Sequence, residues 1–374
     1  MSAPVPPEPA APEPRLVGYG ADVPHAAWPD GARIAVNVVI NVEEGAEERV
    51  GDGFARSEAP LTDQGMADPA LAGRDLAAES LMAYGARVGF WRLHRYFVGL
   101  GLPVTVSACA LALERNPAVA AAVRAAVADH GWDVLAHGYR FSRHYLLHPD
   151  EEAVEIMLAR QRLEALVGRA PQGYYCRYGP SEHTRRLVHA AGYGYDSNAY
   201  DDELPYWTDV DGAAHLVVPH TFSCNDNKYA RGWWATSADF ERYCCDSFDV
   251  LYAEGAERPR LLVISLHPRL SGHPGRFAGV QRVIEHITAH QGVWFTERTV
   301  ADHWRAQHPP PREGPDDRPL AAGRPRRWCR PGAGPTGGPG DRRRAHRRGG
   351  ARRHGGPRRA TGGGRRPPAA DRGW

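Results

Sequence analysis

Lysine is almost absent from this 374-residue chain, in which Lys228 is the single lysine and arginine is abundant. The formal net charge is only +2, but the charges are unevenly distributed. Residues 309–374 hold 18 arginines and five acidic residues, whereas residues 1–308 hold 28 basic and 39 acidic residues. The net charge therefore describes neither part, and composition by itself identifies no partner.

Several other signatures are missing. The six cysteines form neither a CxxC pair nor the dense spacing of a disulfide scaffold, so we expect reduced thiols. No apolar run is long enough to span a membrane, and residues 1–14 lack the basic start and apolar core of a secretory signal. Neither GxGxxG at a strand-to-helix turn nor GxxxxGK before Ser or Thr occurs, so a nucleotide-binding fold has no support. These absences favour a cytoplasmic enzyme.

Short apolar runs alternate with helical patterns through most of the chain. The predicted strands are residues 34–42, 103–109, 132–136, 174–176, 216–221, 261–266 and 293–296. The first run is apolar on both faces, which is typical of a strand in a parallel sheet. Helix starts are marked between the runs, for example by Asn116-Pro117. We predict an α/β fold, a deformed (β/α) barrel of about seven parallel strands in a single domain over residues 15–308. An open doubly wound sheet is the alternative.

Three segments depart from this alternation. Residues 1–14 are rich in proline and are predicted to be a disordered lead-in. Residues 309–374 consist largely of Pro, Gly and Arg and are predicted to be a disordered tail. Such a tail could bind nucleic acid or acidic lipid by charge, but it lacks interleaved aromatic residues, and a shifted reading frame would look the same. Residues 43–75 form an acidic, aperiodic loop, and loops of that length are commonly lids or binding segments.

Polar side chains directly follow four of the predicted strands. Glu43 and Glu44 follow the first, and His137, Arg177 and His267 follow three later ones. Because the carboxyl ends of parallel strands gather on one face, we expect these side chains to share one site. A carboxylate at the end of a buried strand loses hydration, which can raise its pKa, so Glu43 is the candidate general base. The alternatives are a core role for His137 and a structural salt bridge for Arg177.

Five motifs in chain order support a family assignment. They are Glu43-Glu44-Gly45, His137-Gly-Tyr-Arg140, Arg177-Tyr-Gly-Pro180, Asp196-Ser197 and Leu266-His267. Together they resemble the five sequence blocks of the polysaccharide deacetylase (NodB homology) family, over roughly residues 16–306. Val42-Glu-Glu-Gly and Asp202-Glu-Leu-Pro-Tyr-Trp207 resemble in particular its allantoinase-like branch, which acts in purine breakdown.

The resemblance implies roles for individual residues. Glu43 falls where the family has its catalytic acid, Glu44 where it has a metal-binding aspartate, and His137 where it has the first metal-binding histidine. Phe141 stands in place of the second histidine, so the usual zinc site is broken, as in the allantoinase-like branch, which works without a metal. A zinc ion held with the help of His144, otherwise a surface or capping residue, is the alternative.

We therefore expect a hydrolase of non-peptide C–N bonds that opens the cyclic amide of allantoin or a related hydantoin-like ring, without a cofactor. Glu43 would activate water, His267 would protonate the departing nitrogen, and His137 and Arg177 would orient the ring and its oxyanion. The predicted substrate-binding residues are Glu44, Arg140, Asp196 and Trp207, the last in a loop that closes the pocket.

Two other functions fit the same motifs. One is deacetylation of an N-acetyl sugar, peptidoglycan or chitin, and the other is a non-catalytic binding protein that kept the fold. For partners, we expect a small-molecule substrate and a second copy of the chain, and neither a membrane nor nucleic acid.

Overall fold

The computed structural model describes residues 16–65, 71, 73–177, 179–297 and 299–311. The predicted lead-in and nearly all of the predicted tail lie outside the described residues. The strands are β1 (Ile34–Val42), β2 (Thr105–Ala108), β3 (Asp133–Ala136), β4 (Gly173–Tyr174), β5 (Tyr195–Asp196), β6 (Tyr206–Val210), β7 (Ala213–Val217), β8 (Arg260–Leu266) and β9 (Val293–Thr296).

Helices connect most of these strands. The α-helices are α1 (Leu76–Tyr84), α2 (Phe90–Leu100), α3 (Ala110–Arg115), α4 (Pro117–Asp129), α5 (Pro149–Val167), α6 (Thr184–Ala190), α7 (Ser237–Glu254), α8 (Pro274–Thr288) and α9 (Val300–Gln307). Short turns are η1 (Pro29–Gly31), η2 (Val50–Asp52), the π-helical η3 (Gly85–Gly89), η4 (His144–Leu146), η5 (Phe222–Cys224) and η6 (Asp226–Lys228). None of the helices in the described part of the chain combines the length and apolar character needed to cross a bilayer.

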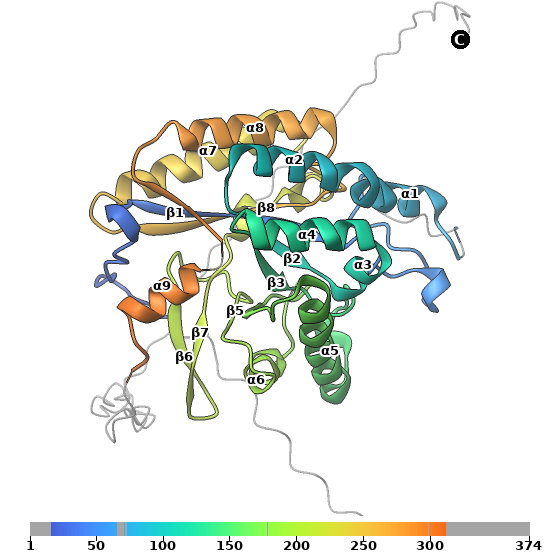
Figure 1. Cartoon of the computed structure of the whole chain (residues 1–374), viewed down its shortest axis with the longest axis horizontal. Coiled ribbons are helices and arrows are strands. Elements are labelled where there is room, and N and C mark those ends of the chain that lie inside the picture. The colour runs from blue at the N-terminus through green and yellow to red at the C-terminus, as the bar shows by residue number, and fades with distance from the viewer. Residues whose placement is uncertain (1–15, 66–70, 72, 178, 298, 312–374) are drawn as a thin grey trace, which may run out of the picture. The chain divides into compact units, whose positions relative to one another are not determined.

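The described strands form one sheet in the order β6-β7-β5-β4-β3-β2-β1-β8, with β9 beside β1. All pairings are parallel except that of β6 with β7. β1 pairs with β8 over Ile34–Ile40, with β9 over Ile34–Asn37 and with β2 over Val39–Val42. The sheet curls and carries helices on its outside (Figure 1). The predicted deformed (β/α) barrel is confirmed, with eight parallel strands among the described residues and one antiparallel strand, β6.

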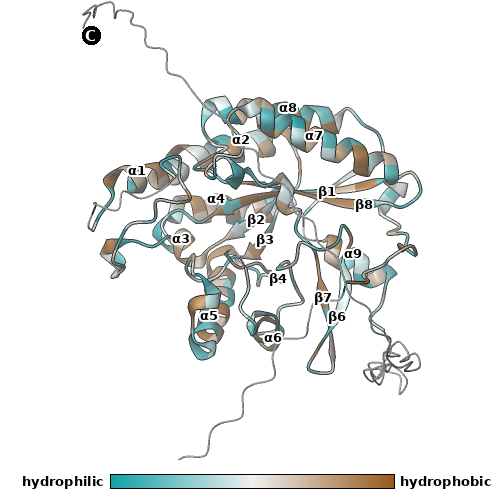
Figure 2. Cartoon of the chain, turned by 180° about the vertical axis from the view of Figure 1, so that it is seen from behind, coloured by the Kyte–Doolittle hydropathy of each residue, from teal (hydrophilic) through white to brown (hydrophobic). Residues whose placement is uncertain are grey.

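Successive side chains of the parallel strands belong to two different buried clusters. In β1, Ile34, Val36, Val38 and Ile40 pack with the apolar residues of α2, α4, α5, α7 and α8. Ala35 and Val39 join a second cluster on the other face of the sheet, which we call the inner face. The same alternation occurs in β8, where Leu261 and Val263 lie on the inner face. The central strands therefore carry buried apolar side chains on both faces, as the sequence predicts, and much of their length is brown in Figure 2.

Helices α1 and α2 are joined by the π-helical turn at Gly85–Gly89. At this turn the helix backbone touches the loop that follows β8. A Cβ atom at Gly89 would lie 2.0 Å from the Pro268 carbonyl oxygen, and one at Gly85 would lie 2.8 Å from Arg269 N. Glycine at both positions thus lets the helix approach the loop that carries His267 and Arg269.

Candidate active site

The inner face of the sheet continues past the ends of the strands. Four predicted catalytic residues continue this alternation and therefore point to the inner side. His137 and Arg177 lie two residues beyond the inner-face residues Leu135 and Tyr175, and Glu43 and His267 lie four residues beyond Val39 and Val263. All four side chains line one pocket. The lining residues are Asn41, Glu43, His137, Phe141, Tyr175, Arg177, Phe222, Asn225, Asn227, Arg231 and His267, around a cavity of about 390 Å³. The structure therefore brings the four predicted catalytic side chains together.

Glu43 lies in the wall of the pocket and is 1% exposed. Its Oε1 lies 3.1 Å from His137 Nε2 and 3.3 Å from His267 Nε2, and its Oε2 accepts a hydrogen bond from Arg269 Nη1 at 2.6 Å. Burial alone would raise the pKa of Glu43, but Arg269 and the two histidines outweigh it and hold the pKa well below its usual value. The prediction that the pKa of Glu43 is raised is wrong, because it did not include Arg269.

His267 is held between two carboxylates. Its Nδ1 donates to Asp226 Oδ1 at 2.5 Å, and its backbone N–H donates to Asp226 Oδ2 at 2.8 Å. Burial lowers the pKa of His267, but Glu43 and Asp226 more than compensate and raise the pKa to about 9. At neutral pH the pocket therefore contains a protonated imidazole beside an ionised carboxylate.

Glu44 is the carboxyl group whose pKa is raised. Its Oε1 accepts from the backbone N–H of Arg269 at 3.2 Å and lies 3.5 Å from Arg269 Nη1, and its Oε2 accepts from Glu43 N at 3.3 Å. Burial, opposed by Arg269 and reinforced by Glu43, raises the pKa of Glu44 to about 7. Unlike Glu43, Glu44 is not among the residues that line the cavity.

The residues at the family's metal position do not fit a zinc site. His137 Nε2 faces Glu43, its Nδ1 lies 2.5 Å from the Tyr175 carbonyl oxygen, and the apolar ring of Phe141 fills the position of the second histidine. His144, the possible replacement, is buried and bonded to Glu152 at 2.9 Å and to Tyr174 Oη at 3.0 Å. It is neither a surface residue nor within reach of the pocket, because both of its ring nitrogens belong to this separate network.

Arg177 lies in the pocket wall, but its guanidinium group is engaged by protein atoms. Nη1 and Nη2 each donate to a Glu58 carboxylate oxygen at 2.8 Å, and Nη1 also donates to the Phe141 carbonyl at 2.9 Å. The salt bridge that the sequence left open for Arg177 is thus present. Glu58 comes from the long loop after β1, which also supplies the Leu61 carbonyl to Arg269 Nε, so this loop packs against the site as a binding segment would.

Three predicted substrate-binding residues lie away from the pocket. Arg140 pairs with Asp52 at 3.1 Å and so fixes η2. Asp196 follows the inner-face residue Tyr195 and therefore points to the outer face, where it bonds Arg185 of α6 at 2.8 Å. Trp207 lies in strand β6, not in a loop, and donates from Nε1 to the His308 carbonyl at 2.8 Å. None of these three side chains lines the cavity, so a role in substrate binding stays a prediction for each of them.

Sequence reasoning also missed functional groups. Arg269 lies two residues after His267, so the alternation along β8 contained a signal for it. Asp226, Asn227 and Arg231 lie in a segment without helical or strand period, which is drawn alongside β8 by a bridge between Asn225 and Ser265. Asn227 Nδ2 lies 3.2 Å from His267 Nε2. No local sequence pattern indicated that this segment meets the pocket.

A second hollow of about 180 Å³ adjoins the pocket and shares four of its lining residues. It is lined by Phe222, Asn225, Asn227, Lys228, Arg231 and Trp233. The ammonium group of Lys228 lies 4.6 Å from the ring centre of Trp233, and Trp233 is 63% exposed. The pocket therefore extends outward over an aromatic and cationic surface.

Known proteins with similar sequences and structures indicate the family to which this chain belongs. No profile of a known protein family matches the sequence. A polysaccharide deacetylase homologue of Schizosaccharomyces pombe is 36% identical over 314 residues, which cover 78% of this chain and 96% of the relative. The crystal structure of PuuE allantoinase is 40% identical with a TM-score of 0.75, covering 79% of this chain and 98% of that one. A Pseudomonas aeruginosa PAO1 structure assigned as a polysaccharide deacetylase is also 40% identical, with a TM-score of 0.74 and coverages of 79% and 99%.

These similarities agree with the fold and with the paired acid and base in the pocket. The protein is a hydrolase that acts on carbon–nitrogen bonds other than peptide bonds. It belongs to the polysaccharide deacetylase family.

Proposed function

We propose that the pocket hydrolyses the cyclic amide of allantoin or a related hydantoin-like ring and that no resident metal takes part. The observation that carries the proposal is the 3.3 Å contact between Glu43 Oε1 and His267 Nε2. The pKa of Glu43 is lowered and that of His267 is raised to about 9, which favours an ionised carboxylate beside a protonated imidazole. A base and an acid are thus already in the protonation states that hydrolysis of an amide requires. The 40% identity to PuuE allantoinase supports the choice of ring.

The geometry suggests how the reaction would proceed. Glu43 accepts a proton from water while the water oxygen bonds to the ring carbonyl carbon. His267 then gives its Nε2 proton to the ring nitrogen as the C–N bond breaks, which leaves a carboxylic acid and an opened ring. Asn227, whose Nδ2 lies 3.2 Å from His267 Nε2, and Arg231 both line the pocket and would donate to the oxyanion.

Substrate entry would also strengthen the base. In the described state Glu43 is a weak base, because three cationic or hydrogen-bonding groups lower its pKa. When the Nε2 proton of His267 is directed to the substrate nitrogen, Glu43 loses one of these partners. The pKa of Glu43 then rises and comes closer to the much higher pKa of the water that it deprotonates, which improves proton transfer in the complex.

The polarity of the cavity favours a small polar ring. Polar side chains make up most of its lining, including Glu43, His137 and Arg177. Three amide side chains, Asn41, Asn225 and Asn227, line it and can pair with the alternating N–H and C=O groups of a hydantoin ring. The metal-free proposal is supported by Phe141, which stands where the resemblance implies a second metal-binding histidine, and by Glu44, which accepts a hydrogen bond from Arg269 N.

A second candidate is the removal of an acetyl group from an N-acetyl sugar. The adjoining hollow favours it, since the exposed ring of Trp233 beside the pocket offers a stacking surface for a sugar ring. The S. pombe relative and the P. aeruginosa structure carry the corresponding description.

A turnover screen on the full chain decides between these functions. Protein treated exhaustively with a chelator is assayed with allantoin, hydantoin and acetylated chitooligosaccharides, with Glu43→Gln as the inactive control. We expect ring opening of allantoin or a hydantoin by chelated protein and its loss in the control. Activity on the oligosaccharides alone, abolished by chelation and restored by zinc, would overturn both the substrate and the metal-free mechanism.

A further inference from the structure

A second group of chemically capable side chains lies on the surface between α7 and α8. Asp249 of α7, together with His286 and His290 at the end of α8, places one possible ligand atom each within 4.8 Å of the others. Among the described residues, this is the one group of three His, Cys, Asp or Glu side chains that meets this spacing. Neither the pocket nor its supporting network uses any of the three.

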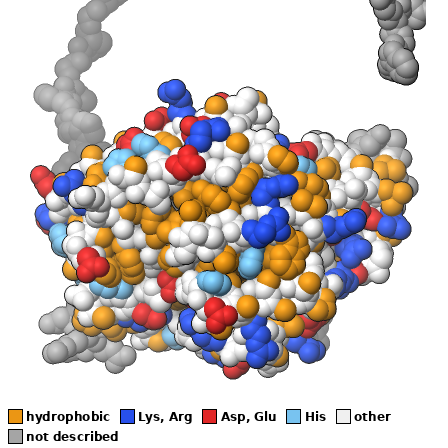
Figure 3. All heavy atoms as spheres, turned by 45° about the horizontal axis from the view of Figure 1, so that its top comes forward, with side chains coloured by type: hydrophobic (Ala, Val, Ile, Leu, Met, Phe, Trp, Pro, Cys, Tyr) orange, Lys and Arg blue, Asp and Glu red, His pale blue; other side chains and the backbone are white. Residues whose placement is uncertain are grey.

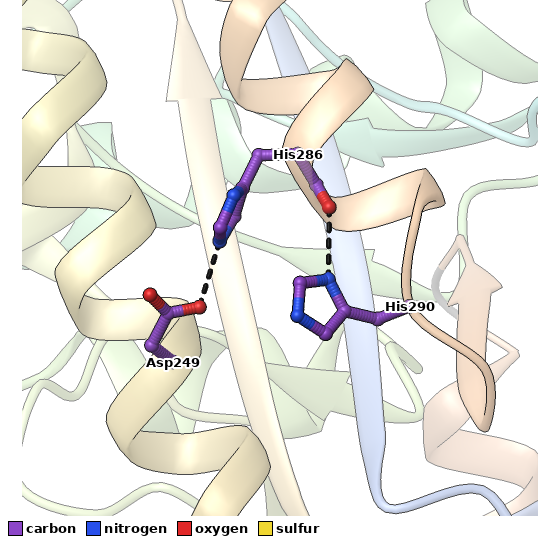
Figure 4. Close-up of side chains that lie close together, drawn as sticks. All are labelled: Asp249, His286 and His290. Carbon is purple, nitrogen blue, oxygen red and sulfur yellow. Dashed lines mark hydrogen bonds and ion pairs between the residues drawn. The ribbon is translucent and has the colours of Figure 1, made fainter.

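The packing of the two helices explains why these side chains converge. His286 lies in the last turn of α8, and His290 lies two residues beyond the end of that helix at Thr288, where its backbone N–H bonds the Ile287 carbonyl. Asp249 faces them from α7, and His286 Nε2 lies 2.7 Å from Asp249 Oδ1. Figure 4 shows both rings and the carboxylate turned toward a common centre. Figure 3, in which the top of Figure 1 comes forward, shows apolar, charged and histidine side chains interspersed on this face of the molecule.

The orientation of His290 is fixed in a way that suits metal binding. Its Nδ1 donates to the His286 carbonyl at 2.9 Å, so the proton is on Nδ1 and the lone pair is on Nε2. Phe248 and Tyr252 contact the ring with centroid distances of 5.0 and 5.1 Å, and Tyr252 Oη donates to the next carbonyl, that of Gln291, at 2.8 Å. Metal-binding histidines typically donate their second nitrogen to a carbonyl in this way.

A plain ion pair accounts for only part of this arrangement. It would explain the contact of His286 with Asp249, but it gives no reason for the Nε2 of His290 to face the same centre, as it does in Figure 4. Two neutral imidazoles and a carboxylate form a ligand set for a borderline divalent ion such as Zn²⁺, whereas Mg²⁺ and Ca²⁺ prefer oxygen ligands.

We propose that Asp249, His286 and His290 bind one Zn²⁺ or a similar divalent transition-metal ion. The side chains of Asp249 and His286 are 51% and 34% exposed, so water completes the coordination. Metal binding displaces the hydrogen bond between Asp249 and His286 and links the two helices through a single ion.

The position in the fold indicates a structural role for the ion. α7 ends just before β8 begins, and α8 ends just before β9 begins, so the ends of both helices lie near the amino ends of these strands. The pocket lies at the carboxyl ends of the strands. In (β/α) barrels the chemistry belongs to the carboxyl face and the opposite face contributes stability. The site therefore clamps α7 to α8 and leaves turnover to the pocket.

The test measures zinc binding and melting temperature on the full chain after removal of metals. Isothermal titration with ZnCl₂, with MgCl₂ as the comparison, is carried out on the wild type, His286→Gln/His290→Gln and Asp249→Asn. His130→Gln, which changes an exposed histidine at the end of α4, is the matched control. His137→Gln tests the pocket as the source of binding.

We expect the double variant to lose one zinc-binding event or to bind zinc more than about 100-fold more weakly than the wild type. This loss exceeds the 10- to 100-fold that removal of an outer-shell partner of a metal ligand typically costs. The wild type, His130→Gln and His137→Gln should keep it. At zinc about 100 times its dissociation constant, the melting temperature of these three should rise by about 5 °C, while that of the double variant stays constant.

Metal-free melting temperatures of the variants show whether each is folded, and Asp249→Asn, which keeps both imidazoles, serves if the double variant is not. Binding that persists in both variants, or that disappears only in His137→Gln, overturns the proposal. A response to MgCl₂ equal to that with ZnCl₂ overturns the assigned ligand chemistry.

Discussion

Replacing Asp226 by Asn should move the alkaline limit of activity to lower pH. Asp226 is fully buried and bonds His267 through both carboxylate oxygens, at 2.5 and 2.8 Å. Glu43 and Asp226 together raise the pKa of His267 to about 9 from the ordinary 6.5. Because this pKa is raised, the acid form of His267 is present below about pH 9 and is lost above it.

The size of the effect follows from the charge that is removed. One opposite charge at hydrogen-bonding distance shifts a pKa by about 1–3 units. If the pKa of His267 falls by one unit, the protonated fraction at pH 8 drops about 2-fold, and if it falls by two units, about 10-fold. At pH 6 either shift changes the protonated fraction by about 10% or less, so the loss of activity should depend on pH.

The assay is kcat/KM for ring opening between pH 5.5 and 10. Asp302→Asn, which changes an exposed aspartate of α9, is the control and should keep the wild-type profile. Melting curves at pH 6 and pH 8 separate a loss of folded protein from a loss of the acid. An alkaline limit at the same pH in Asp226→Asn and the wild type would refute the assignment of His267 as the acid whose proton Asp226 retains.

Three further substitutions test the other assignments. Glu43→Gln keeps the shape of the side chain and removes the base, so kcat should fall by roughly 10²- to 10⁴-fold while substrate binding measured by calorimetry persists; retention of more than a tenth of wild-type turnover would argue against Glu43. The pKa of Glu44 is raised to about 7, so its contribution to the free energy of unfolding is present below pH 4.5 and is lost as the pH rises through 7, by at most about 3 kcal/mol. Glu44→Gln should abolish this change in the free energy of unfolding between pH 5 and pH 8. An unaltered pH dependence in the variant would count against the raised pKa. Trp207→Phe should lower the melting temperature through loss of its bond to His308 and leave KM within about 2-fold, and a KM raised more than 10-fold with an unchanged melting temperature would return Trp207 to the substrate site.

The order of strands and helices and the core of the site could be predicted from the sequence because both follow from local alternation. Glu43, His137, Arg177 and His267 continue the period of two along buried strands, so their convergence required only that the strands be parallel. The same rule should have excluded Asp196, since its neighbour Tyr195 already occupies the inner face. The prediction used the position of Asp196 at the end of a strand but not the face of the sheet to which its side chain points.

Other features depend on contacts between distant segments. Asp226 approaches His267 because the segment before α7 lies alongside β8. That segment has no helical or strand periodicity from which this contact could be predicted. Strand β6 did have a local signal, because Asp211-Gly212 is a common hairpin turn and Asp211 has a φ of 53°. The raised pKa was assigned to the wrong carboxyl group because Arg269 is 226 residues from Glu43 in the sequence.

Because β1 pairs with β8 and β9, the site can form only after the last strands of the barrel have been synthesised. Glu43 and Glu44 emerge early on the ribosome as two adjacent carboxyl groups that are to be buried, yet their shared counter-charge, Arg269, is added more than two hundred residues later. Until then, closing β1 into the interior would leave uncompensated charge in an apolar environment. The first strand should therefore stay undocked during translation, and docking of the last strands should neutralise the carboxyl groups and complete the catalytic apparatus in one late folding step.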